Sequence, residues 1–542
     1  MAKDPITVAL TGMLPLVMIA GALLAAPAAA LLLWLYRRAV LRGMSESRGG
    51  AAVSVAARSR MEAPRRTLEF LSLATNAAPA AAFRGAWRAA LVYIAAGSAF
   101  AMTLTAVWLI STHDREIGPI KLLLLFWTFA WPAVLAVILV AAEDRARKFW
   151  IVAGYFAVYA ALVVAAHARS PEATWKELAL FWMIENGAPT VLLYLFLMRR
   201  IRSVGPLVLV FAVIALLGSQ LALSFLGASD ARMRAAVEIA GSVGFGGTGT
   251  FVATLLLGLI VFAVLGWLVL RWIGARYATK KLSDESLTID AIFLLFSINA
   301  SIDFVFEHWA WIAAGLVAFA AYKLVARLGF RLLPKVATPK RLLLLRVFAL
   351  GARSEPLFDA LRKQWLRGGS IAMIAGPDLV TSAVEPHEFL DFLAGHLGRT
   401  FIEDEVGIER RVAAIDPLPD PDGRYRITEF FCHDDTWQAT LRRLVSGSDA
   451  VLMDLRSFSP SNQGCVYELG RLLDALDLKR VVFVTDKTTD RPFLEATLQE
   501  LWSKLANESP NRLAAEPAAR FMEVRGPTAS EMQTLVAHFA SA

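Results

Sequence analysis

Long apolar runs are the feature that most limits how this chain can fold. Seven stretches of about 20 residues or more are almost free of charged side chains, and a helix of that length spans the hydrocarbon core of a bilayer. Hydrophobic residues make up 57% of the chain and charged residues only 19%. A soluble protein contains about 45–50% apolar residues. We therefore expect an integral membrane protein.

A further region, residues 288–326, holds two shorter apolar runs separated by Glu307 and His308. Together they are too long for one span, and each is long enough for a thin one. We read them as a helical hairpin. The predicted fold of residues 1–335 is a membrane α-helical bundle of about nine transmembrane helices. The predicted spans are 7–36, 89–111, 120–142, 149–167, 178–198, 205–226, 248–270, 289–306 and 309–326.

Basic residues between the spans predict the orientation. The loops after odd-numbered spans carry 20 Lys and Arg residues, whereas the opposite loops and the N-terminus together carry 7. Because basic loops remain on the cytoplasmic side, we expect the N-terminus outside and residues 336–542 in the cytoplasm. A further basic run after the ninth span agrees with this parity. The expected location is a bacterial inner membrane, with the lipid bilayer as partner.

The net charge of +8 is explained by these basic loops, so no nucleic-acid partner is expected. The first cytoplasmic loop, about residues 43–86, is rich in Arg, Ala and Ser. It either contacts anionic lipid headgroups or is a solvated linker. Cys432 and Cys465 belong to no CxxC motif and no Cys/His cluster, so no metal is expected.

A few polar residues fall inside the predicted spans. An ionisable group at membrane depth is costly, which makes it a candidate functional residue. Pro189 follows Glu185 and Asn186 in the sequence. A proline can break a spanning helix, and such a break can expose backbone groups to a site. Either these residues form a small ligand or ion site, or they pair between helices. They are Glu185, Asn186, Asn299 and Asp303.

After residue 335 short β-rich runs alternate with amphipathic stretches. This alternation predicts a soluble α/β domain, residues 336–542, with a flavodoxin-like, doubly wound parallel sheet. The expected strands are 342–350, 370–375, 450–455, 480–485 and 520–524. The expected helices are 354–367, 434–446, 465–476, 492–505 and 528–540.

Polar residues follow the carboxyl ends of the first three of these strands, where doubly wound sheets bind ligands. A loop of Ser, Asn and Gly at 457–464 then opens a helix, and the free N–H groups of a helix N-terminus suit a phosphate. Glu468 is expected in the first turn of that helix, beside the ligand. The predicted ligand-binding residues are Gly351, Arg353, Gly376, Asp378, Asp454, Arg456, Ser461 and Asn462.

The stretch from Ser448 to Gly470 resembles two related families. In TIR domains a strand and a serine-containing loop precede a helix that begins with Cys-x-x-Glu-Leu, as residues 465–469 do. In the nucleoside 2-deoxyribosyltransferase-like group an Asp-ended strand and a Glu-Leu-Gly helix match Asp454 and residues 468–470. In both families the glutamate is the key residue in cleaving an N-glycosidic bond. The resemblance implies a catalytic role for Glu468.

Several functions remain open at this point. In the first hypothesis, the chain is a membrane-anchored sensor or effector whose TIR-like domain binds a nucleotide such as NAD, with or without cleavage of its N-glycosidic bond. Alternatively, it is a transporter or channel regulated by nucleotide binding, or a non-catalytic scaffold whose α/β domain binds a partner protein. A homo-oligomer is expected. Besides NAD or another nucleotide as ligand, no cofactor is implied.

Overall fold

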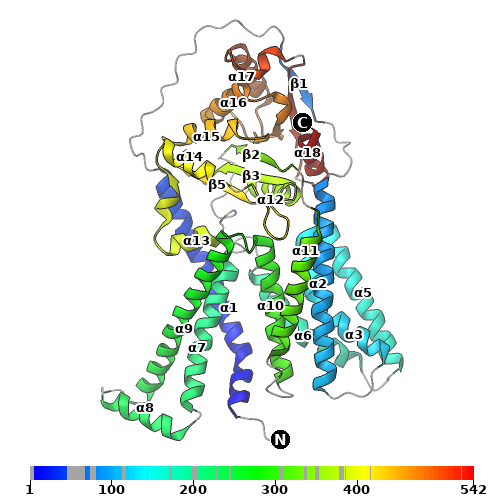
Figure 1. Ribbon diagram of the computed structural model, residues 1–542, viewed down its shortest axis with the longest axis vertical. Helices are drawn as coiled ribbons and strands as arrows, with labels where there is room; N and C mark the ends of the chain where they lie inside the picture. The colour runs from blue at the N-terminus through cyan, green and yellow to red at the C-terminus, as the bar shows by residue number, and fades with distance from the viewer. Residues whose placement is uncertain are drawn as a thin grey trace. The chain divides into compact units, whose positions relative to one another are not determined.

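The computed structural model (Figure 1) describes most of the chain. The described residues are 5–45, 67–73, 81–112, 118–142, 144–169, 174–196, 204–227, 229–242, 244, 246–305, 311, 313–334, 338–347, 353–376, 384, 386–415, 417–514, 516–526 and 528–541.

The chain divides into two compact units. The helical unit comprises Met1–Leu35, Ala90–Leu332 and Val384–Leu390, and the sheet unit comprises Tyr36–Ala89, Leu333–Ala383 and Asp391–Ala542. The sheet unit is therefore discontinuous in sequence and includes residues from the first predicted cytoplasmic loop. The helices before the sheet are α1 (Pro5–Ser45), α2 (Ala81–Ser111), α3 (Pro119–Phe129), α4 (Trp131–Ala141), α5 (Arg145–Arg169), α6 (Trp175–Phe196), α7 (Gly205–Gly227), α8 (Asp230–Ser242), α9 (Gly247–Ala278), α10 (Asp284–Val305) and α11 (Ala314–Leu332).

Five of these helices are long and apolar enough to cross a membrane within the described residues, and a bent pair raises the number to six. The five lie in α1, α2, α5, α7 and α9. The bent pair, α3 and α4, falls on the predicted span 120–142 and turns by 46°. Pro132 lies at the start of α4 and cannot donate a backbone hydrogen bond to the preceding turn.

The predicted count of nine spans is not confirmed. Helices do form at the other three predicted positions, as α6, α10 and α11, but they are only 22, 22 and 19 residues long. Each carries at least three charged residues, which lowers its mean hydropathy. In addition, α8 was not predicted, and none of its residues, all of which the structure describes, is buried.

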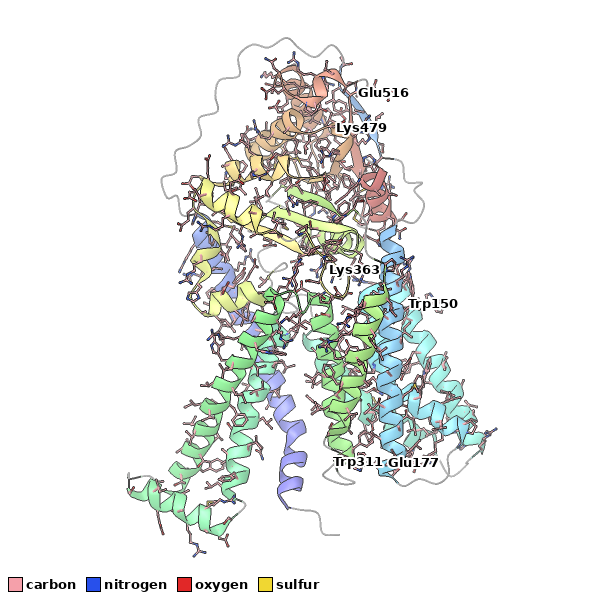
Figure 2. All side chains as sticks on the ribbon, in the orientation of Figure 1. Trp150, Glu177, Trp311, Lys363, Lys479 and Glu516 are labelled. Atoms are coloured by element: carbon pink, nitrogen blue, oxygen red, sulfur yellow. The ribbon has the colours of Figure 1, made fainter. Side chains whose placement is uncertain are left out.

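The helical unit turns apolar side chains outward, as lipid contact requires. On α9 the exposed side chains include Leu257, Ile260 and Val264. At the start of α5, Trp150 is 70% exposed and points away from its helix (Figure 2). Lys148 precedes it by two residues in the same helix, and Trp and Lys are both typical of the interface between headgroups and hydrocarbon. These features are compatible with membrane insertion.

The predicted hairpin at 288–326 corresponds to α10 and α11, which pack side by side. A Cβ atom at Gly315 would lie 1.8 Å from the Ser297 carbonyl oxygen, so this close approach requires glycine. An ion pair of 2.6 Å joins Asp290 of α10 to Lys323 of α11. Burial of both charges together reduces the cost of placing either one between helices.

The sheet unit holds eight strands and the helices that cover them. The strands are β1 (Glu69–Ser72), β2 (Lys340–Arg346), β3 (Gly369–Ile374), β4 (Phe401–Ile402), β5 (Ile427–Cys432), β6 (Ala450–Asp454), β7 (Val481–Thr485) and β8 (Ala518–Glu523). The helices are α12 (Ser354–Trp365), α13 (Pro386–Leu393), α14 (Glu405–Ala413), α15 (Trp437–Ser446), α16 (Gln463–Ala475), α17 (Arg491–Ser503) and α18 (Ala529–Ser541).

The strands pair in the order β1-β8-β7-β6-β2-β3-β5-β4, and every pair is parallel. The five predicted strands are β2, β3, β6, β7 and β8, and in their own chain order they lie as 2-1-3-4-5. The direction of winding reverses between β2 and β6, which is the switch point of a doubly wound sheet. The parallel sheet predicted from the sequence is thus confirmed, with three further strands.

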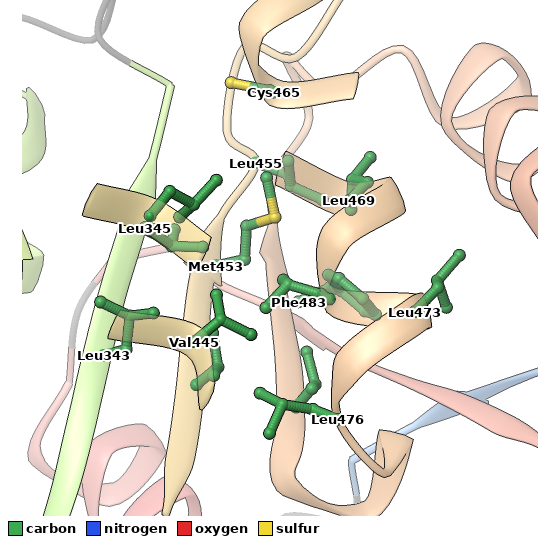
Figure 3. Packing of buried hydrophobic residues seen from close by; sticks show 14 of the residues in the cluster. Leu343, Leu345, Val445, Met453, Leu455, Cys465, Leu469, Leu473, Leu476 and Phe483 are labelled. Carbon is green, nitrogen blue, oxygen red and sulfur yellow. The ribbon is translucent and has the colours of Figure 1, made fainter. Parts of the chain in front are cut away.

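Buried residues lie on both faces of this sheet, as in other parallel sheets. Leu343 and Leu345 of β2 face a core formed with α15, α16 and α17. Leu342 and Leu344 face the opposite core, formed with α12 and α18. Figure 3 shows the first core, in which Leu469 of α16 packs over the end of β6. This packing fixes α16 relative to the carboxyl ends of the strands.

Two segments from before residue 90 attach to the sheet. In β1, the backbone N–H of Glu69 donates to the Pro517 carbonyl at 2.9 Å, and β1 pairs in register with β8. At the end of α1, the Gly43 carbonyl accepts a hydrogen bond of 2.7 Å from His433 Nδ1. A Cβ atom at Gly43 would lie 2.6 Å from the Phe401 ring. Glycine therefore permits this contact.

Candidate functional site

The switch point brings Arg346, the last residue of β2, opposite Asp454, the last residue of β6. Cross-strand partners in a sheet project to the same face. Both side chains are buried, at 3% and 2% exposed. Sequence analysis singled out Asp454 but not Arg346. Arg346 lies within an apolar run, and its pairing with Asp454 depends on a contact between strands far apart in the chain.

Glu468 is the most unusual group near this edge. It is 3% exposed, and its Oε2 atom has no hydrogen-bond partner. Burial raises the pKa of its carboxyl to about 8, against the opposing effect of the Arg346 charge. With this pKa, the carboxyl is largely protonated at neutral pH. Sequence analysis placed Glu468 in the first turn of its helix. Because α16 begins at Gln463, Glu468 lies in the second turn instead.

Asp454 forms a closed ion pair with Arg456. The Arg456 Nε atom donates to Oδ1 at 2.8 Å, and Nη2 donates to Oδ2 at 2.6 Å. The backbone N–H of Arg456 also donates to Oδ1, at 3.2 Å. Both side chains are buried, so the pair is strongly held. A ligand hydroxyl would have to share the Asp454 oxygens with Arg456.

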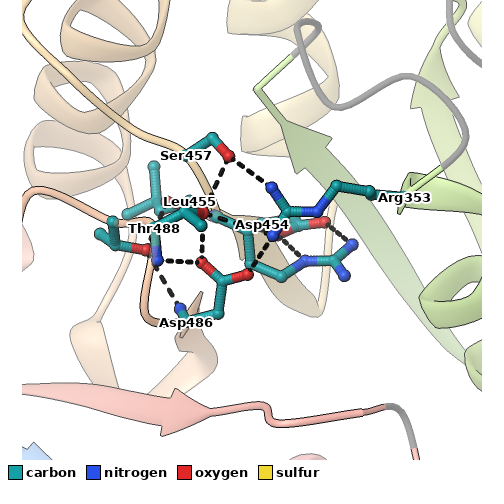
Figure 4. A network of polar contacts seen from close by, with 8 residues as sticks. Arg353, Asp454, Leu455, Ser457, Asp486 and Thr488 are labelled. Atoms are coloured by element: carbon teal, nitrogen blue, oxygen red, sulfur yellow. Dashed lines mark hydrogen bonds and ion pairs between the residues drawn. The ribbon is translucent and has the colours of Figure 1, made fainter.

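Arg353 joins three loops at the same edge (Figure 4). Its Nη2 atom forms an ion pair of 2.5 Å with Asp486, in the loop after β7. Its Nη1 atom donates to Ser457 Oγ at 3.0 Å, in the loop after β6. Ser457 has φ of 59°, which is uncommon outside glycine and is often found at functional sites. The guanidinium of Arg353 is half exposed and can meet an anion.

The loop before α16 is organised by its own side chains. Asn462 Oδ1 accepts hydrogen bonds from the Ser459 N–H at 2.9 Å and from Ser459 Oγ at 3.0 Å. Ser461 Oγ lies 2.8 Å from Ser459 Oγ. The Asn462 side chain does not cap the helix. The Asn462 carbonyl accepts from the N–H groups of Cys465, at 3.0 Å, and Val466, at 3.3 Å, so the N–H groups of Gln463 and Gly464 are the candidates for a ligand acceptor.

Of the remaining predicted ligand residues, Gly376 is buried just after β3. Gly351 and Asp378 lie outside the described residues. Among the residues that the structure describes, no three His, Cys, Asp or Glu side chains are grouped to hold a metal ion.

Cys465 is a second group that links the helix to the strands. Its Sγ atom lies 4.0 Å from the Arg346 carbonyl oxygen. Burial, together with the negative charges of Glu468 and Asp454, raises the pKa of this thiol far above its usual range. Such a thiol is a poor nucleophile. We therefore assign it a packing role.

Some of the polar residues in the predicted spans form hydrogen bonds between helices. Asn299 Nδ2 donates to the carbonyl oxygens of Glu185, at 3.1 Å, and Ile184, at 3.3 Å. Asn186 Nδ2 donates to the Thr128 carbonyl at 3.2 Å. Asp303 lies in α10, but its side chain is outside the described residues.

Pro189 explains the bond from Asn299. Proline has no N–H with which to reach the carbonyl four residues earlier, and that carbonyl belongs to Glu185. The Asn299 amide of α10 supplies a donor instead. This contact is what a membrane helix with an internal proline needs, so it accounts for Asn299 without a ligand.

Comparison with known proteins adds no identification: no family model, no curated protein and no solved structure matches this chain. The fold and the site define it as a protein with membrane-type helices and a doubly wound parallel sheet, with a buried glutamic acid at the switch point.

Proposed function

We propose that the chain is a membrane-anchored sensor or effector whose TIR-like domain binds a nucleotide such as NAD and cleaves its N-glycosidic bond. The observation that carries the proposal is the buried carboxyl of Glu468 close to the switch point, whose Oε2 atom has no hydrogen-bond partner. The strand order 2-1-3-4-5 supports a flavodoxin-like sheet, whose ligands bind at that point.

The chemistry follows from charge. As the N-glycosidic bond of NAD breaks, the nicotinamide leaves as a neutral molecule with the bonding electrons, and positive charge develops on the ribose. A carboxylate close to the sugar stabilises this charge or attacks the carbon covalently. Water then completes the hydrolysis to ADP-ribose. Because the nicotinamide ring of NAD is itself cationic, bound substrate would favour ionisation of Glu468.

The surroundings suit the rest of such a ligand. Arg353 is half exposed at the carboxyl edge, and the N-terminus of α16 offers backbone N–H groups. Arginine and helix N-termini are both common phosphate partners. The diphosphate of a dinucleotide would lie along these groups, with the scissile bond toward Glu468.

We further propose nine membrane crossings, with the N-terminus outside and the sheet unit in the cytoplasm of a bacterial cell. Counting the bent pair as one span and adding α6, α10 and α11 to the five clear helices gives nine. The excess of basic residues in the loops after odd-numbered spans supports this orientation. Clustering of a homo-oligomer in the membrane would then bring sheet units together.

Nicotinamide release tests the catalytic proposal. The full-length protein, reconstituted into vesicles at low and high density, is incubated with NAD, and the products are separated by chromatography. We expect turnover by the wild type and a loss of about 100-fold or more in Glu468→Gln, which has the same shape without the charge.

Glu500→Gln is the matched control. Glu500 lies on α17, is 65% exposed and pairs with Lys504, so this variant is expected to turn over NAD like the wild type. Equal turnover by wild type and Glu468→Gln would remove Glu468 from the reaction. Absence of turnover at every density would reject cleavage of NAD.

A further inference from the structure

We propose that Asp486 is a positioning residue for the ligand: it anchors Arg353 at the carboxyl edge of the sheet, where this arginine meets the diphosphate. The inference rests on the proposed function and concerns the phosphate subsite of the same site. Asp486 lies directly after β7, outside the stretch from Ser448 to Gly470 that resembles known families.

The first step is how Asp486 is itself held (Figure 4). Its Oδ1 atom accepts two hydrogen bonds from Thr488, one from the backbone N–H at 2.9 Å and one from Oγ1 at 2.6 Å. The backbone N–H of Asp486 donates to Thr489 Oγ1 at 3.1 Å. Thr489 Oγ1 in turn donates to the Leu455 carbonyl, just after β6, at 3.0 Å. The carboxylate is therefore fixed in its own loop, and that loop is tied to the end of β6.

The second step is to identify the anchored member of the ion pair. Asp486 Oδ2 accepts from Arg353 Nη2 at 2.5 Å. The hydroxyl groups of Ser457 and Thr488 add contacts of 3.0 and 3.3 Å to the same guanidinium. The Asp486 side chain is 13% exposed, whereas that of Arg353 is 49% exposed. Asp486 is thus the fixed member of the pair, and the long side chain of Arg353 is ordered against it.

The third step is the consequence for a ligand. A guanidinium has five N–H donors, and half of the Arg353 side chain reaches solvent. Arg353 can therefore bind a phosphate oxygen while it keeps its bond to Asp486. Because the arginine is ordered before the ligand arrives, less conformational freedom is lost on binding. We expect this gain to exceed the repulsion between Asp486 and the phosphate, which water and salt screen at an exposed site.

ADP binding by the full-length protein in nanodiscs tests this inference. Asp486→Asn keeps an oxygen that can accept from Thr488 but removes the charge that holds Arg353. We expect the affinity for ADP to fall about tenfold in Asp486→Asn, the effect of ordering one long side chain. In an Arg353→Met background the same substitution should change the affinity by less than about twofold, because the residue through which Asp486 acts is gone.

Glu409→Gln is the matched control. Glu409 also forms an ion pair with a partly exposed arginine, Arg443, at 2.6 Å, but it lies on α14 and not at the carboxyl edge. This variant should bind ADP like the wild type. If Asp486→Asn does not fold, Thr488→Val takes its place in the same comparison, because it removes a hydroxyl that anchors the carboxylate.

An affinity for ADP that is unchanged in Asp486→Asn would overturn the proposal, and so would a higher affinity, since Asp486 would then compete with the phosphate. An equal loss in the wild-type and Arg353→Met backgrounds would also overturn it, because Asp486 would not act through Arg353. The measurement needs no turnover. Absence of ADP binding by the wild type would reject the proposed nucleotide site as a whole, whereas binding that does not depend on Asp486 would reject only its positioning role.

Discussion

Because almost none of the Glu468 side chain reaches solvent, its carboxylate form lacks the hydration that stabilises an exposed acid. The pKa of the group is accordingly raised from 4.5 to about 8. A raised pKa in a folded protein is also a statement about stability. An unfolded chain releases this proton at a lower pH than the folded one does.

The first prediction concerns Glu468→Gln. In the wild type, the stabilising effect of keeping Glu468 neutral is complete below about pH 4.5 and is lost as pH rises to about 8. The glutamine variant has no such loss. Its melting temperature should therefore rise relative to that of the wild type as pH increases through this interval, and the difference should be constant above it. The corresponding change in the difference in unfolding free energy is on the order of 5 kcal/mol.

Thermal unfolding of both proteins in detergent, from about pH 5 to about pH 9, measures this gain. Glu500→Gln, at an exposed site, should show no comparable trend. A constant difference between wild type and Glu468→Gln across the range would mean that Glu468 is not buried in its neutral form.

At this scale the sequence pointed to Glu468, Asp454 and Arg456 but not to their arrangement. Glu468 was recognisable from a local pattern. The position of Arg346 opposite Asp454 depends on the register between β2 and β6, which no local pattern contains. Likewise, the bidentate pairing of Asp454 with Arg456 depends on side-chain conformations in the loop.

At the scale of elements, the proline in α6 and the asparagine in α10 act as one unit. Pro189 removes an N–H from the helix, and Asn299 donates to the carbonyl that this N–H would have reached. The contribution of either residue to the free energy of unfolding should therefore depend on the presence of the other.

The second prediction is a double-mutant cycle on this pair. Asn299→Leu alone should lower stability by about 1–2 kcal/mol, because the Glu185 carbonyl loses a donor. In a Pro189→Ala background, the alanine N–H can reach that carbonyl, and the same change should cost less. Unfolding in mixed micelles measures the four variants.

Asn186→Leu is the matched control, since Asn186 donates to Thr128 on a different helix. Its cost should be the same in the wild-type and Pro189→Ala backgrounds. If Asn299→Leu also costs the same in both backgrounds, the compensation between proline and asparagine does not exist.

Strand β1 allows a sharper test of how an element is held. The N–H groups of Glu69 and Leu73 donate to β8 or to the residue preceding it. Because strands alternate, the N–H of Leu71 also faces β8, whereas that of Ser72 faces away.

The third prediction follows from this alternation. Leu71→Pro removes a hydrogen bond of the ladder and should speed amide exchange in β8 by about tenfold or more. Ser72→Pro removes an outward N–H and should leave the exchange of β8 close to that of the wild type. Hydrogen–deuterium exchange of residues 518–523 reads both. Equal exchange in the two variants would argue against the pairing of β1 with β8.

The elements that sequence analysis found and those it missed differ in where their information lies. The runs at β2, β6 and β7 are apolar on both faces and could be recognised locally. Strands β1 and β4 have four and two residues and lie at the two edges of the sheet, and β5 contains Thr428 and Glu429. Such short or polar strands are specified mainly by their neighbours.

At the scale of the whole molecule, the chain passes between its two units more than once. The first 35 residues belong to the helical unit, and the same helix, α1, continues into the sheet unit as far as Ser45. The sheet unit then takes β1 from the segment before α2. The charge and hydropathy patterns indicated the division near residue 335, but they could not reveal these attachments, which depend on tertiary contacts.

In the proposed sensor, a movement of α1 would reach the sheet through the hydrogen bond between Gly43 and His433. Strand β1 is a second attachment of the same unit. Both segments are part of the unit that contains Glu468. For this reason the full-length protein, and not residues 336–542 alone, is the form to be assayed.

The central claim is that a nucleotide binds at the carboxyl edge between β2 and β6. Hydrogen–deuterium exchange of full-length Glu468→Gln in nanodiscs, with and without NAD, tests it without turnover. We predict slower exchange with NAD in residues 455–463 and at the end of β2, and no change in β1 or β4. Unchanged exchange at the edge, or protection confined to other parts of the chain, would contradict the account.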